Sequence, residues 1–458
     1  VFFFSSFAQK GRVMGASRTN VAKPWRSEVY VVMDDVPHEV LRHELAHAVA
    51  AEFGRGPFDV AGDAGGLVPN PGIIEGVASA AEGPRGELTH HQWAAAMKRL
   101  GILPSLERAM GLEFFDFSAS AVYTASGSFI AWLRERRGAS AIRAIYGGAS
   151  FEEATSEPLR ELEKEWLAFL DTVPLEGADL GAARLRFDRP SVVRSTCVHE
   201  VARLDAEADD FADEGDRSGA IAAREEACER SSGATDARYD LFRTVAAFRD
   251  EGAIRDMARE LERSPEMSAA RLAQIAEVLA DLDAEAGRLG DAARAYAAIV
   301  PDAASDDVRR RLQLKKRLCE TGIGAEPAIL GALAAQRPLR GAKDALVALR
   351  IGELAGGSGD PWLEYLAGRQ HFRYRDYSGA LFWLEASERD GLSSTTAEIE
   401  SAGRMLRGRA LFQLGRMSEA RSVFEELAAA ARSREGEREL AADWVLRCDF
   451  ASRKGGSS

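Results

Sequence analysis

Two histidines flank a three-residue spacer near the start of the chain, in the sequence His43-Glu44-Leu45-Ala46-His47. On a helix, residues four apart project from the same face, so both imidazoles can reach one ion. Zinc binds neutral imidazole readily, and hydrolytic zinc sites keep one coordination position for water. The spacing therefore predicts one Zn²⁺ ion held by His43 and His47, with Glu44 as the general base that takes the water's proton. The alternative is a surface helix with two incidental histidines.

Such a site needs a third protein ligand. A metzincin would place a histidine six residues after His47, but that residue is Phe53, so this class is excluded. Glu75 is the strongest candidate, because it lies in the next expected helix and its neighbour Gly76 allows helices to pack closely. The expected ligand set is therefore His43, His47 and Glu75.

The motif followed by Glu75-Gly76-x-Ala78 resembles the gluzincin metallopeptidases, the thermolysin-like group with two histidines and a glutamate on zinc. The resemblance covers roughly residues 27–170 and implies a peptidase that hydrolyses peptide bonds with a metal-activated water. It also implies an edge strand that binds the extended substrate. Ser27–Met33 is the candidate for that strand, because it is rich in β-forming residues and contains no breaker.

One position departs from the gluzincin pattern. Many gluzincins carry an acidic residue four positions after the glutamate ligand, where it bonds to a ligand histidine. That position is Ser79 here. Since such partners fix the imidazole tautomer and tune metal affinity, a backbone carbonyl or Asp34 would have to replace it.

The resemblance also implies a tyrosine or histidine that stabilises the oxyanion. Tyr123 is the candidate, because it precedes the small residues of 126–129 on an expected helix. His90, His91 and Tyr146 are alternatives, and a buried core role for Tyr123 is equally compatible with the sequence.

The elements that position these residues follow from helix punctuation. The first helix is expected to open at Val36–Pro37 and to end before Gly54, with Leu45 and Val49 on its core face. A second helix is expected from Pro71 to about Glu82. Further helices are expected at roughly 89–100, 103–111, 119–137, 139–146 and 157–171.

The composition changes near residues 175–190, where glycine- and proline-containing sequence gives way to Ala-, Arg-, Glu- and Leu-rich sequence. The expected fold is mainly α: a zincin-like metallopeptidase domain, with a small β-sheet plus helices, followed by an α-helical repeat solenoid. The expected boundaries are 1–175 for the first domain, 176–189 for a linker, 190–452 for the repeats and 453–458 for a flexible tail.

The second part contains a recurring pattern of a turn followed by a small residue. Its copies begin at Gly215, Gly290, Arg375 and Gly415. The stretch 406–424 resembles a tetratricopeptide repeat, which implies paired helices and a surface for a protein partner. The repeat predicts that four alanines are buried between helices: Ala220, Ala295, Ala380 and Ala420. The alternative is a non-repeating helical bundle.

A net charge of −13 argues against a nucleic-acid partner. No stretch approaches the roughly 18 apolar residues that a membrane span needs, although Val1–Phe7 is expected to be either a buried first strand or the end of a span. The expected function is a zinc peptidase with repeats for substrate or partner binding. The alternative is a non-catalytic binding scaffold with a degenerate peptidase domain.

The four cysteines, at positions 197, 228, 319 and 448, form no CxxC pair, which excludes a zinc ribbon. Free thiols are one expectation. A Cys197–Cys228 disulfide is the other, and it would place the chain outside the reducing cytoplasm, as an extracytoplasmic or membrane-tethered protein.

Overall fold

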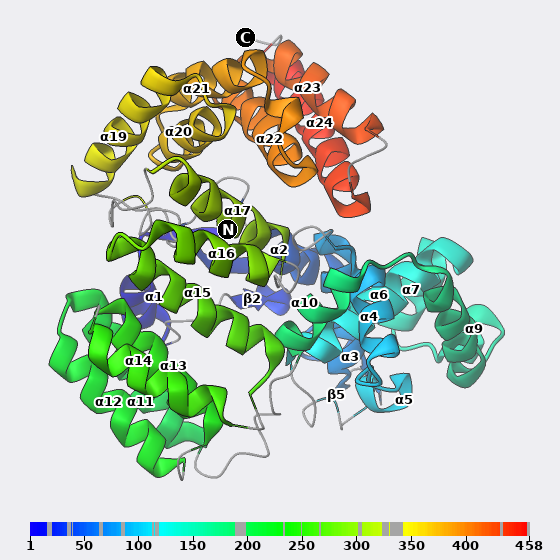
Figure 1. Cartoon of the computed structure of the whole chain (residues 1–458). Coiled ribbons are helices and arrows are strands. Elements are labelled where there is room, and N and C mark those ends of the chain that lie inside the picture. Colours follow the sequence, from blue (N-terminus) through cyan, green and yellow to red (C-terminus); the bar gives the residue numbers. More distant parts are fainter. Residues whose placement is uncertain are drawn as a thin grey trace. The chain divides into compact units, whose positions relative to one another are not determined.

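The chain forms two compact units in a computed structural model, Val1–Ser195 and Thr196–Ser458. Both units are mainly helical, as expected (Figure 1). The structure describes every residue except 16–20, 34–37, 39, 64–66, 84–87, 112–113, 115–118, 188–197, 232–233, 249, 265–266, 301–304, 323–328, 330–341, 431–433 and 456–458.

A small three-stranded sheet opens the first unit, in the order β1-β3-β2. Strand β1 (Phe2–Phe4) runs parallel to β3 (Glu28–Val32), and β2 (Val21–Lys23) runs antiparallel to β3. Helix α1 (Phe7–Met14) follows β1. The strand expected at Ser27–Met33 is confirmed as β3, but its expected role as an edge strand was wrong. Within the described sheet, β3 is paired on both sides. Strand β2 is therefore an outer strand, and it contacts the helix that carries the histidine motif.

The histidine motif lies on helix α2 (Leu41–Ala50). The helix begins at Leu41, later than the expected opening at Val36–Pro37; His38 is not helical, and residues 36–37 lie outside the described residues. The expected core face was wrong, because Leu45 and Val49 are 37% and 61% exposed. His43, Glu44 and His47 lie instead on the buried face, since helix α3, β2 and β3 pack against α2.

Helix α3 (Pro71–Glu82) has the bounds that its sequence predicts. Asn70 caps it by accepting a hydrogen bond from the Ile73 amide, and Pro71 occupies the first turn, where its missing N–H costs nothing. Helix α3 packs closely on α6 (Ala119–Arg137). A Cβ on Gly127 would lie only 2.7 Å from Ser79 Cβ, so the two backbones approach too closely for larger residues.

The rest of the first unit surrounds this helix pair with an aromatic core that includes Trp93, Phe129 and Trp166. The expected helices are present, most with small shifts at their ends, although the one expected at 103–111 is reduced to Leu106–Ala109. They are α4 (His90–Arg99), α5 (Leu106–Ala109), α7 (Ala139–Tyr146) and α9 (Leu159–Thr172). Four further elements were not predicted from the sequence: strands β4 (Gly62–Asp63) and β5 (Val68–Pro69), which form a hairpin, and helices α8 (Phe151–Thr155) and α10 (Gly177–Phe187).

The linker expected at 176–189 was wrong over α10. Ala183 and Phe187 are buried in the core of the first unit, and Phe187 packs edge-on against Trp93. The apolar residues of this segment recur at helical spacing, so it buries a stripe against α4 and α6 despite its glycines. The first unit consequently extends past residue 175.

The second unit is built from helices that pack on their sequence neighbours from α11 to α17 and again from α19 to α24, while α17 also contacts α20 and α22. In Figure 1, α19 to α24 lie side by side, coloured yellow to red. Its elements are α11 (Val198–Glu214), α12 (Arg217–Arg230), α13 (Thr235–Ala247), α14 (Glu251–Glu262), α15 (Ala269–Glu285), α16 (Leu289–Ile299), α17 (Asp306–Glu320), α19 (Ala342–Ser358), α20 (Pro361–Arg373), α21 (Tyr377–Arg389), α22 (Ala397–Gln413), α23 (Met417–Ala429) and α24 (Glu435–Gly455), with a 3-10 turn at Leu392–Ser394. Because α24 runs to Gly455, the predicted tail from 453 is helical in its first part.

The recurring alanines test the predicted repeat. Ala220, Ala380 and Ala420 are fully buried, as expected. The fourth position was wrong: Ala292 is fully buried and Ala295 only half-buried. The reason is that the turn before α16 contains Gly287, with φ +78°, whereas Gly290 lies inside the helix.

The different burial of Ala292 and Ala295 provides a matched pair of variants. We expect Ala292→Leu to destabilise the second unit by about 1–3 kcal/mol, because the added side chain overpacks a filled helix interface. Ala295→Leu, on the same helix, should cost less. Urea denaturation followed by circular dichroism measures both, and equal losses would contradict this register.

The described helices include none that combines the length and hydropathy required to cross a membrane. At the start of the chain, Phe4 is buried in β1, whereas Phe2 and Phe3 are largely exposed. Cys228, Cys319 and Cys448 are free thiols. Cys197, the expected partner of Cys228, lies outside the described residues.

Candidate metal centre

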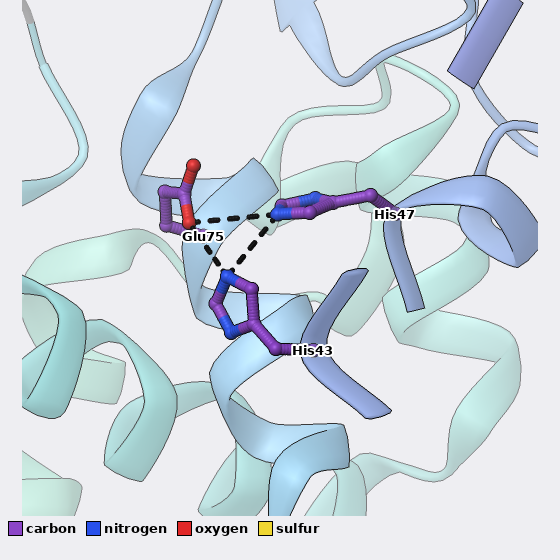
Figure 2. Close-up of side chains that lie close together, drawn as sticks. All are labelled: His43, His47 and Glu75. Carbon is purple, nitrogen blue, oxygen red and sulfur yellow. Dashed lines mark hydrogen bonds and ion pairs between the residues drawn. The ribbon is translucent and has the colours of Figure 1, made fainter. Parts of the chain in front are cut away.

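Three potential ligand atoms converge between α2 and α3 (Figure 2). His43 and His47 lie one helical turn apart on α2, and their Nε2 atoms are 3.2 Å apart. Glu75, on α3, places Oε2 3.2 Å from Nε2 of His43 and 3.6 Å from Nε2 of His47. The structure thus brings together all three residues that the sequence proposes as ligands.

These separations suit a tetrahedral ion. Zinc bonds of about 2.0–2.1 Å at tetrahedral angles place neighbouring ligand atoms about 3.3–3.4 Å apart. Two neutral imidazoles can share one Nε2–H···Nε2 hydrogen bond when their tautomers differ, whereas a metal ion between them accepts the Nε2 lone pairs of both rings. Two imidazoles and one carboxylate are a donor set that zinc accepts, so the residues fit this metal.

The ionisation of the metal-free site follows from the same contacts. Burial by itself lowers the pKa of His43, but the carboxylates of Glu75 and Glu82 outweigh it and raise the pKa to about 9. Burial by itself raises the pKa of Glu75, but hydrogen bonds and charge from the two histidines outweigh it and lower the pKa to about 2. In the metal-free site, an imidazolium at His43 therefore faces the Glu75 carboxylate.

Zinc affinity should consequently rise with pH. His43 is mostly protonated at pH 7, and zinc binds only the neutral ring, so binding must release this proton. We expect the apparent affinity to increase about tenfold per pH unit from pH 7 up to about pH 9 and then to level off. Competition titrations against a chromophoric chelator measure this slope, and an affinity that is constant over the interval would contradict it.

Glu44 lies on the buried face of α2, beside the three candidate ligands. Burial raises the pKa of its carboxyl, and the charge of Glu75 adds to the increase; His47, His43 and a hydrogen bond from the Ala22 backbone act in the opposite direction. A raised pKa strengthens a carboxylate as a base. Ala22 belongs to β2, so this contact also places the outer strand next to Glu44.

Of the candidates for oxyanion stabilisation, Tyr123 lies beside the ligands. Its ring is nearly parallel to that of His43, with the centroids 6.3 Å apart, and its side chain is half-buried. His91 is partly buried and bonds elsewhere, with Nδ1 2.9 Å from the Ser128 hydroxyl. Tyr146 is 2% exposed and feels the charge of Glu75, but its hydroxyl is buried in this structure, whereas Tyr123 is only half-buried. Tyr123 remains the candidate.

The sequence did not identify Glu82 as part of this site. Its Oε2 lies 3.5 Å from Nδ1 of His43, the ring nitrogen that does not face Glu75 and His47. Ser79, where gluzincins carry their acid, packs against α6 instead. Asp34, the other suggested substitute, lies outside the described residues. The sequence did contain one feature that could have identified Glu82: it lies on the same helix as Glu75, about two turns further along.

No family model matches this chain, and no match was found among curated proteins or solved structures. The function proposed for the chain therefore depends on the geometry of its own residues.

Proposed function

We propose that this chain is a zinc-dependent peptidase of the HExxH gluzincin type. The observation that supports it most directly is the convergence of His43, His47 and Glu75 with distances that suit tetrahedral zinc. A helix with two incidental histidines gives no reason for a carboxylate from a second helix to meet both rings.

Each residue has a distinct role in the proposed hydrolysis. His43, His47 and Glu75 would hold the ion, which supplies a polarised water and a positive charge near the scissile carbonyl when bound. Glu44 accepts the proton of the attacking water and then delivers it to the leaving amine. Tyr123 donates a hydrogen bond to the oxygen that becomes negative in the transition state.

The proposed substrate is an extended peptide that pairs with β2. Within the described sheet, β2 has β3 on one side only. The Ala22 backbone bonds to Glu44, so this strand lies next to the general base. A peptide added to β2 gains main-chain hydrogen bonds while one of its carbonyls lies near Glu44.

The second unit would bind the protein substrate or another protein partner through tetratricopeptide-like repeats. Consecutive helix packing and the fully buried Ala220, Ala380 and Ala420 support this part of the proposal. Small residues also permit close helix approach, since a Cβ on Gly408 would lie 2.6 Å from the Phe424 ring.

Metal analysis tests the proposed function. The purified full chain should contain one equivalent of zinc, and His47→Ala should contain far less, as measured by plasma mass spectrometry after dialysis. Zinc-dependent cleavage of a quenched peptide library should accompany the bound metal. A wild-type chain that neither retains nor binds zinc would overturn the proposal and favour a binding scaffold with a degenerate site.

A further inference from the structure

The buried contact between His43 and Glu82 lies outside the three-ligand set. The side chains of His43 and Glu82 are only 9% and 6% exposed, and Nδ1 is 3.5 Å from Oε2. A carboxylate removed from water is costly unless a partner compensates for its charge. The Nδ1 side of His43 provides such a partner within the described residues.

Helix geometry explains why position 82, rather than position 79, meets the histidine. At about 100° per residue, Glu82 points within about 20° of the direction of Glu75, whereas Ser79 is rotated by about 40° to the other side. Ser79 also lies at a close approach of α3 to α6, opposite Gly127. Because that interface has no room for a carboxylate, an acid on this face fits only one turn further along.

The geometry points to Glu82 as the positioning residue of His43: it accepts a hydrogen bond from Nδ1–H and so keeps the Nε2 lone pair directed at the metal. This inference rests on the proposed metal site. Neutral imidazole carries one ring proton, and a carboxylate at Nδ1 holds that proton there. At 3.5 Å the two atoms form an ion-pair contact, and we expect this separation to shorten to the roughly 2.7–2.9 Å of a charge-assisted hydrogen bond in the metal-bound protein.

The inference also distinguishes Glu82 from a residue that only fills space. Glu82→Gln keeps the volume and an acceptor oxygen but removes the charge, whereas Glu82→Ala removes both. Outer partners of metal-bound histidines typically contribute about 10–100-fold to metal affinity. We therefore expect Glu82→Ala to lose affinity within that range and Glu82→Gln to lose less. Exposed Glu52, changed to Gln, is the matched control and should leave the affinity unchanged.

Two measurements on the whole 458-residue chain test the role of Glu82. Chelator competition gives the zinc dissociation constant of each variant. Nitrogen-15 NMR of histidine-labelled, zinc-loaded protein reports whether His43 retains a protected Nδ1–H. The inference predicts that this proton is present in wild type and in Glu52→Gln but exchanges rapidly in Glu82→Ala.

Wild-type affinity and a protected Nδ1–H in both Glu82 variants would overturn the role of Glu82. The proposed function would survive that result if Glu75→Ala still lost zinc. Absence of zinc binding by the wild-type chain would instead overturn the metal site and this inference together. Melting temperatures of the metal-free variants show whether a loss of affinity reflects unfolding.

Discussion

Replacing Glu44 with glutamine should leave zinc bound and reduce hydrolysis by ~10²–10⁴-fold, the range expected for loss of a general base. The amide has nearly the same size as the carboxylate but cannot accept the water's proton. His43 and His47 keep their places on α2, so the ligand set is unchanged. The measurement is kcat/KM on a peptide cleaved by the wild type, together with zinc content.

The zinc content makes this variant informative. A Glu44→Gln protein that binds one equivalent of zinc and has lost activity assigns the proton transfer to Glu44. A variant with wild-type activity would remove Glu44 from the mechanism. Glu52→Gln, at an exposed position just beyond the end of α2, is the control and should retain full activity.

The second large effect concerns the third ligand. Glu75→Ala should weaken zinc binding by more than the roughly 10–100-fold typical of outer-shell partners, because it removes one of three protein ligands. It also leaves the two Nε2 atoms, 3.2 Å apart, without the carboxylate that contacts both of them. Competition titration at fixed pH measures the change.

Comparison of the zinc affinities of Glu75→Ala and Glu82→Ala distinguishes a metal ligand from a positioning residue. If Glu75 is a ligand and Glu82 a positioning residue, the affinity should fall most in Glu75→Ala, less in Glu82→Ala and not at all in Glu52→Ala. Equal affinities for the Glu75 and Glu52 variants would show that the third ligand has been misassigned.

Local sequence determined the elements that carry the site. Asn70 and Pro71 define the start of α3, and Gly83 follows its end, so its bounds were predictable from capping alone. The i, i+4 spacing of His43 and His47 placed both rings on one face of α2. Glu75 could be proposed because it lies on the next helix, among residues small enough for close packing.

Tertiary structure decided which faces are covered and which groups meet across helices. Leu45 and Val49 looked like core residues, but β2, β3 and α3 bury the opposite face of α2. Strand β3 had the composition of a strand, yet its pairing on both sides leaves β2 as the outer strand. The glycines of α10 suggested a linker, but its apolar stripe is buried against α4 and α6.

Glu82 shows why the sequence predicted the helices of the site but not every contact between them. Helical periodicity specifies that residues 75, 79 and 82 of α3 project in nearby directions, and the sequence alone supplies that information. Which of them can hold an acid near His43 depends on the close approach of Gly127 to Ser79. That approach arises from the crossing of two helices distant in sequence, so only the folded chain assigns the position of the carboxylate.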